Sequence, residues 1–197
     1  SFARVLWRVA AADVSQGNRV VLLRDGAATF EAMLAVIAAA RYTVDLEAYI
    51  FRGKDEIGQQ FVQAMIDAAR RGVRARLLVD WVGGRGTPRR IWKELREGGV
   101  TVRSFSPPGL RSWLGLLPRD HRKLLVADGK VGITGGVGIG HEWRFGSVGP
   151  KRTPWRDLAV QIRGPAAEAM ERAFDAMWSR AVGAGPPRRE SRRMVRA

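Results

Sequence analysis

Short apolar segments alternate with helical segments along the chain, and this alternation constrains the fold more than any other feature. The spacing of apolar residues predicts strands, helices and one hairpin. The strands are expected at residues 20–23, 43–51, 74–81 and 100–105, the helices at 27–41, 56–71, 88–97 and 165–182, and the hairpin within 124–133. The alternation predicts an α/β fold. We expect a layered α/β/α sandwich, in which helices cover both faces of a mixed central sheet.

The composition fits one folded domain with short extensions. The chain has 197 residues, of which 46% are hydrophobic, so it can bury a core of ordinary size. Glycine and proline at 183–187 interrupt the last helical pattern, and an arginine-rich segment follows. We therefore expect an N-terminal extension at residues 1–17, a folded domain at 18–182, and a basic Pro/Arg-rich linker or tail at 183–197.

The residue counts exclude several classes of site. Cysteine is absent, which excludes a disulfide framework and a thiolate zinc site. The two histidines leave little for a His-rich metal site, and we expect no metal and no cofactor. No run of about 18 apolar residues occurs, so we expect no transmembrane segment in this chain.

The chain is strongly basic, with a net charge of +15 and a pI of about 11.5. Arginine far outnumbers lysine, and its planar guanidinium suits phosphate groups. An anionic partner is therefore expected. Anionic lipid headgroups and nucleic acid both fit, and charge alone does not choose between them. A solvated arginine-rich surface is the alternative for part of the excess.

His121, Lys123 and Asp128 form the candidate catalytic motif. In an extended segment successive side chains point to opposite faces, so His121 and Lys123 share one face and Arg122 points to the other. A neutral imidazole can attack phosphorus to form a phosphohistidine, and an ammonium group can neutralise the phosphate oxygens. The pair suits attack on a phosphodiester without a metal.

Asp128 allows two interpretations. Asp128-Gly129 is typical of a type I′ turn between residues 124–126 and 131–133. Asp128 would then either orient a histidine or hold the hairpin. For His121 and Lys123 alone, a β-hairpin with a surface histidine is an equally good interpretation.

The wider pattern resembles a known signature. His-x-Lys, four residues, Asp128, six residues and then Gly135-Gly136 is similar to the signature of the phospholipase D superfamily. The chain looks most like the N-terminal half of a bacterial cardiolipin synthase. Further similar segments are residues 44–51, 68–80, 155–157 and 164–165, with Phe174 and Trp178. The resemblance covers residues 18 to 182 and implies a phospholipase D-like fold.

The resemblance also implies site residues beyond the motif. Glu47 is an acidic position that approaches the site in such proteins, although a surface carboxylate paired with arginine is an equal alternative. Gly135, Gly136 and Glu142 match positions that contribute to substrate binding. One departure concerns Gly138, where the family usually carries asparagine.

A second departure concerns the number of motifs. Family members resemble two-fold assemblies, in which one histidine is the nucleophile and another protonates the leaving alcohol. This chain has one motif, and its second histidine, His141, is followed at the lysine position by Trp143. We therefore expect either a homodimer or a second motif domain outside this sequence. His141 itself is either a surface histidine or a second acid.

The segment from residue 106 to 118 bears on the substrate. Trp113, Leu114, Leu116 and Leu117 form an apolar group between two arginines just before the motif. Such a loop suits contact with a bilayer interface. Packing over the core or over a partner domain is the alternative.

These features together predict a phosphatidyltransferase or phospholipase D-like enzyme that acts on anionic phospholipid through a phosphohistidine. The resemblance implies phosphatidylglycerol as the donor and a peripheral location at the cytoplasmic membrane. Two alternatives stay open: a self-dimerising single-motif phosphodiesterase or endonuclease, and an inactive protein that binds anionic surfaces.

Overall fold

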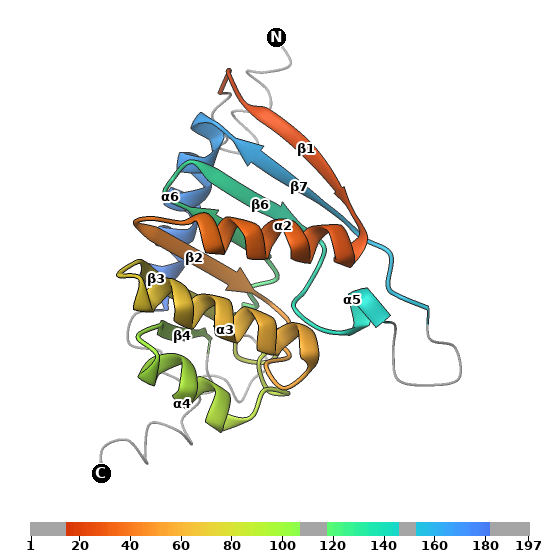
Figure 1. The fold of residues 1–197 in the computed structure, drawn as a ribbon, viewed down its shortest axis with the longest axis vertical. Coiled ribbons are helices and arrows are strands. Elements are labelled where there is room, and N and C mark those ends of the chain that lie inside the picture. Colours follow the sequence, from red (N-terminus) through yellow and green to blue (C-terminus); the bar gives the residue numbers. More distant parts are fainter. Residues whose placement is uncertain (1–14, 107–117, 146–152, 182–197) are drawn as a thin grey trace.

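The computed structural model describes residues 15–106, 118–145 and 153–181. Its strands form a single seven-stranded sheet (Figure 1). The strands are β1 (Arg19–Arg24), β2 (Thr43–Ala48), β3 (Arg74–Asp80), β4 (Thr101–Phe105), β5 (Leu124–Ala127), β6 (Val131–Gly135) and β7 (Leu158–Arg163). The helices are α2 (Asp25–Ala39), α3 (Glu56–Arg70), α4 (Arg89–Glu97), α5 (Glu142–Phe145) and α6 (Pro165–Arg180).

The sheet is mixed, as predicted. Its order is β1-β7-β6-β5-β2-β3-β4. The neighbours β2, β3 and β4 run parallel, because helices α3 and α4 connect them, whereas the other pairs are antiparallel. The antiparallel pairing of β2 with β5 brings the C-terminal end of β2 beside the N-terminal end of β5, directly after His121 and Lys123.

Helices cover both faces of the sheet, which confirms the α/β/α sandwich. Figure 1 shows α2, α3 and α4 in front of the sheet and α6 behind it. The front layer packs on a large apolar cluster that includes Phe30, Leu46 and Leu125. The rear cluster is smaller and joins α6 to the alternate side chains of the same strands, among them Leu124 and Val126. Successive side chains of β5 therefore point to opposite faces of the sheet, with Leu125 on the front face and Leu124 and Val126 on the rear face.

Strand β1 leads into α2 without an intervening loop, because α2 begins at Asp25. Asp25 has φ +65°, and this left-handed conformation reverses the chain within one residue. Gly26 is needed for close packing, since a Cβ there would lie 2.4 Å from the carbonyl oxygen of Trp143. Gly26 therefore allows α2 and α5 to pack closely together.

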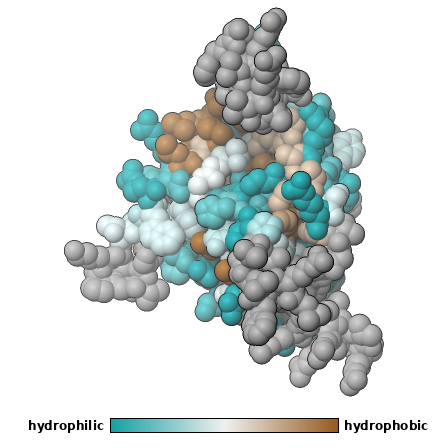
Figure 2. All heavy atoms as spheres, turned by 180° about the vertical axis from the view of Figure 1, so that it is seen from behind, coloured by the Kyte–Doolittle hydropathy of each residue, from teal (hydrophilic) through white to brown (hydrophobic). Residues whose placement is uncertain are grey.

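The far edge of the sheet carries exposed apolar side chains. Val20, Val21, Leu22 and Leu158 on β1 and β7 are 40–60% exposed. Figure 2 shows hydrophobic residues gathered toward this edge on the α6 side of the molecule. None of the helices in the described ranges combines the length and apolarity that crossing a bilayer requires. The predicted extension at 1–17 and the tail at 183–197 lie almost wholly outside the described residues.

Candidate active site

A pocket of about 450 Å³ opens at the end of the sheet where β2 and β6 end and β7 begins, near α5 in Figure 1. The side chains that line the pocket therefore come from segments that lie far apart in the sequence. Its lining residues are Tyr49, Ile50, His121, Lys123, Gly136, Trp143, Trp155, Arg156 and Asp157.

His121 and Lys123 share this pocket, as their spacing predicts. They lie in the extended segment just before β5. The Lys123 ammonium Nζ lies 3.3 Å from Nδ1 of His121 and donates to the His121 carbonyl oxygen at 2.7 Å. The His121 ring rests on Tyr49 with 4.5 Å between ring centroids, and Lys123 lies over the same ring. The imidazole is thus exposed but oriented.

The surroundings of Lys123 tune its charge. Partial burial lowers the pKa of the Lys123 ammonium below its ordinary value, and the nearby carboxylates of Asp157 and Asp120 oppose this shift. A partly desolvated ammonium attracts phosphate oxygens more strongly than a fully hydrated one does.

Gly135 and Gly136 let β7 and its preceding segment approach the motif. A Cβ on Gly135 would lie 2.3 Å from the Leu158 carbonyl oxygen, and one on Gly136 would lie 2.1 Å from the Asp157 carboxylate. Gly136 also lines the pocket, and its amide donates to the Leu158 carbonyl. The glycines therefore admit the carboxylate of Asp157 into the pocket.

Tyr49 and Asp157 are pocket residues that were not predicted as site residues. The sequence predicts a strand over residues 43–51, but β2 ends at Ala48 and the chain bends at Tyr49. The Tyr49 ring contacts the His121 ring at this bend. Asp157 belongs to residues 155–157, one of the segments that resemble the family. That resemblance was the signal that could have identified Asp157 as a site residue.

Glu47 does not line the pocket. Its carboxylate, 1% exposed, accepts two hydrogen bonds from the Arg122 guanidinium, at 2.7 and 2.8 Å. Burial and the neighbouring Asp120 side chain raise the pKa of Glu47 to about 8, against the effect of Arg122. Asp120 in turn receives the Arg122 amide and donates its own amide to Asp80. Glu47 therefore approaches the motif from the buried side.

Asp128 lies at the opposite end of β5 from His121 and Lys123. Its carboxylate accepts the amides of Arg41, Tyr42 and Thr43 at 2.7–3.0 Å. These hydrogen bonds hold the pKa of Asp128 below its ordinary value, although partial burial opposes them. Asp128 and Gly129 both have positive φ, as a type I′ turn requires. These contacts support holding the hairpin over orienting the histidine of the same chain.

The glycine at 138 has a structural reason. A Cβ there would lie 2.6 Å from the Trp143 ring, which is 5% exposed and lines the pocket. The indole occupies the space that an asparagine side chain would need.

Glu142 also lies outside the residues that line the pocket. Its Oε1 accepts from Nε of Arg52 at 3.2 Å, and its backbone carbonyl accepts the Trp155 amide. Trp155 packs edge-on against Trp143, with 4.9 Å between ring centroids. Glu142 therefore supports the pocket wall through its backbone. The predicted membrane contacts Trp113, Leu114, Leu116 and Leu117 lie outside the described residues.

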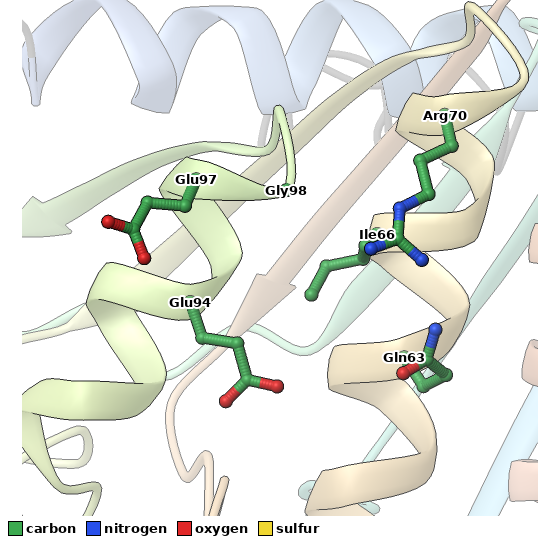
Figure 3. Close-up of a pocket in the computed structure, with 6 residues that line it drawn as sticks. All are labelled: Gln63, Ile66, Arg70, Glu94, Glu97 and Gly98. Carbon is green, nitrogen blue, oxygen red and sulfur yellow. The ribbon is translucent and has the colours of Figure 1, made fainter.

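A second pocket, of about 310 Å³, lies between α3 and α4. In Figure 3 the Glu94 side chain of α4 points toward α3, which carries Gln63, Ile66 and Arg70, whereas the Glu97 side chain points away from α3. It contains no nucleophile and lies apart from His121.

Comparisons with known proteins identify the family of the chain. A family model described as "Cardiolipin synthase, PLD-like domain" matches residues 33–178. Cardiolipin synthase A of Pseudomonas aeruginosa strain PAO1 is 36% identical over 185 residues, which are 93% of this chain and 37% of that protein. The major cardiolipin synthase of Bacillus subtilis strain 168 is 36% identical over 168 residues, or 85% of this chain and 34% of that protein.

A solved structure shares the fold. Nuc from Salmonella typhimurium, described as a phospholipase D family member, matches with a TM-score of 0.62 at 20% identity, over 83% of this chain and 96% of that one. The present chain spans little more than a third of the curated relatives it matches. The family model nevertheless covers most of its domain, and the chain belongs to the family of cardiolipin synthase phospholipase D-like domains.

Proposed function

We propose that this chain supplies the nucleophilic half of a phosphatidyltransferase site. The observation that carries the proposal is the pairing of His121 with Lys123 in one pocket, 3.3 Å apart, beside Gly136 and Asp157. The pair has an exposed nitrogen nucleophile and a fixed cation. The cardiolipin synthase names of the relatives support phosphatidylglycerol as the donor.

In the first step, Nε2 of His121 attacks the phosphatidyl phosphorus. A P–N bond forms, and the P–O bond to the headgroup glycerol breaks. Lys123 neutralises the charge on the non-bridging oxygens. In the second step, the hydroxyl of an acceptor attacks the phosphohistidine and gives its proton to the second histidine described below. The P–N bond breaks, which releases the imidazole and yields a new phosphodiester.

The contact between His121 and Lys123 determines which nitrogen of the His121 ring carries the proton before and after phosphate binds. A charged ammonium only donates, so in the free chain it makes Nδ1 the acceptor and places the neutral ring's proton on Nε2. A bound phosphate competes for the ammonium. Once Lys123 turns to the phosphate, Nδ1 carries the proton and Nε2 becomes free to attack.

The leaving glycerol needs a proton, and we propose that a second motif supplies it. The sequence has only two histidines, and His141 does not line the pocket. Another copy of the chain or a further domain of a longer protein would provide the second histidine. General acid catalysis contributes about 10²–10⁴-fold, so an isolated subunit has low activity on natural lipids.

The pocket mouth suits a peripheral position on an anionic bilayer. Trp155 is 45% exposed and the adjacent Arg156 is 83% exposed at its side chain. An indole beside a guanidinium fits the boundary between acyl chains and phosphate headgroups. The net charge of +15 attracts the chain to such a surface.

Product analysis by mass spectrometry tests the proposal. The chain and His121→Ala are incubated with phosphatidylglycerol vesicles, and a parallel arm contains DNA. Cardiolipin or phosphatidic acid formed only by the native chain supports the proposal. DNA cleavage without lipid products supports the endonuclease instead. Lipid or DNA binding without any product, equal in both variants, supports the inactive binding protein.

A further inference from the structure

A second cluster of ionisable side chains lies beside the loop that follows β6. Asp55 is the N-cap of α3, His141 directly precedes α5, and Glu142 is the first residue of α5. One ligand atom from each residue lies within 4.8 Å of the other two. The cluster shares no side chain with the pocket that holds His121.

Hydrogen bonding alone does not satisfy this cluster. Nδ1 of His141 lies 3.0 Å from Oδ2 of Asp55 and 3.7 Å from Oε2 of Glu142. Nδ1 carries at most one proton, so it can serve only one of the two carboxylates. Oδ2 of Asp55 already receives the His141 amide at 2.8 Å, whereas Oε2 of Glu142 is buried without a hydrogen-bond partner. A buried anionic oxygen left in this way is costly.

We propose that Nδ1 of His141 and the carboxylates of Asp55 and Glu142 bind a Zn²⁺ ion. Zinc binds imidazole nitrogen and carboxylate oxygen at about 2.0–2.2 Å, so tetrahedral ligand atoms lie about 3.3 Å apart. The separations of 3.0 and 3.7 Å bracket that value. Water completes the tetrahedron. The imidazole favours zinc over Mg²⁺ and Ca²⁺, which prefer oxygen ligands.

The neighbouring residues orient the ligands. Arg52 holds Oε1 of Glu142 at 3.2 Å, which leaves Oε2 directed to the cluster. Gly140 gives this oxygen room, because a Cβ there would lie 2.3 Å from it. Oδ1 of Asp55 accepts the Gly58 amide, so the other oxygen faces His141. Two carboxylates outweigh the single guanidinium, and the site keeps a net negative charge for a cation.

A bound ion would join the start of α3 to the loop before α5. Trp143 follows Glu142 directly, and Trp155 donates its amide to the Glu142 carbonyl. Both indoles line the catalytic pocket. Zinc at this place would therefore stabilise the pocket wall without contacting the reacting phosphate.

The sequence makes a zinc titration unusually clear, because the whole chain has two histidines and no cysteine. The metal-free full chain is titrated with Zn²⁺ by calorimetry and with Co²⁺ by visible absorption. The variant His141→Asn is compared with His121→Asn, which removes the only other imidazole. Thermal unfolding with and without Zn²⁺ follows each variant.

We expect one Zn²⁺ per chain, a higher melting temperature with zinc, and visible Co²⁺ bands in both the native chain and His121→Asn. His141→Asn and Glu142→Gln should weaken zinc binding by at least about tenfold and lose the bands. Glu142→Gln tests the site independently if His141→Asn does not fold. Absence of stoichiometric binding by the folded native chain, or equal binding by Glu142→Gln, would overturn the proposal. Loss of binding in His121→Asn instead would assign the metal to the catalytic pocket.

Discussion

The two faces of the segment at residues 120–123 differ in every physical respect. His121 and Lys123 point into an open pocket and contact each other and Tyr49. Asp120 and Arg122, which alternate with them, lie on the other side of the segment, where Asp120 is buried and the half-buried Arg122 joins Glu47. Period-two alternation therefore places reactive groups and anchoring groups one residue apart. Side chains on the buried face fix the backbone that positions those in the pocket.

The largest effect should come from the pocket face. His121→Gln should lower product formation by about 10³-fold or more, because no other described pocket side chain is an imidazole. Its stability should change by only about 0.5 kcal/mol, since His121 is exposed. Activity assays and urea unfolding measure the two effects. A large loss of stability in His121→Gln would contradict the view that His121 serves the reaction and not the fold.

On the buried face, Glu47→Ala should destabilise the fold by about 1–3 kcal/mol, because it removes the carboxylate that accepts two hydrogen bonds from the Arg122 guanidinium. Glu47→Gln keeps an acceptor for Arg122 and a donor for Asp120, so it should cost much less. Urea unfolding of both variants gives the comparison. Equal stability of Glu47→Ala and the native chain would show that the buried face anchors nothing.

Asp128, which lies outside residues 120–123, tests whether a carboxylate at the far end of β5 stabilises the fold without affecting the pocket. Asp128→Ala removes the acceptor for the amides of Arg41, Tyr42 and Thr43 and should cost about 2 kcal/mol. Asp128→Asn keeps one acceptor oxygen and should lose less. Activity normalised to the folded fraction should stay near the native value in both. A specific loss of turnover in Asp128→Asn would instead support the orienting role.

A smaller effect should appear in the pH dependence of stability. The folded-state pKa of Glu47, about 8, lies above the ordinary 4.5, so the folded state binds its proton more tightly. The resulting stabilisation is complete below the ordinary pKa and disappears as the pH rises through the folded value. Between pH 6 and pH 7 the native chain should lose about 1 kcal/mol relative to Glu47→Gln. Parallel pH dependences would mean that Glu47 is ionised throughout.

The sequence was sufficient for the layered fold and for the pairing of His121 with Lys123, because both follow from periodicity and short spacing. It left open whether Glu47 approaches the motif or pairs with an arginine at the surface, because its buried position depends on the pairing of β2 with β5. It missed Tyr49 because the contact of its ring with His121 joins segments that lie far apart in the sequence. Long-range packing explains Gly138 and Asp128, whose neighbours Trp143 and Thr43 are visible only in three dimensions.

The central claim is that His121 is the nucleophile, and trapping the covalent adduct tests it most directly. A p-nitrophenyl ester of phosphatidic acid has a leaving group that needs no proton, so the reaction does not depend on a second motif. We expect a burst of p-nitrophenolate that approaches one per chain, with an acid-labile phosphatidyl group on the peptide containing His121. His121→Gln should show neither. An unchanged burst in that folded variant, or an adduct on another residue, would contradict the account.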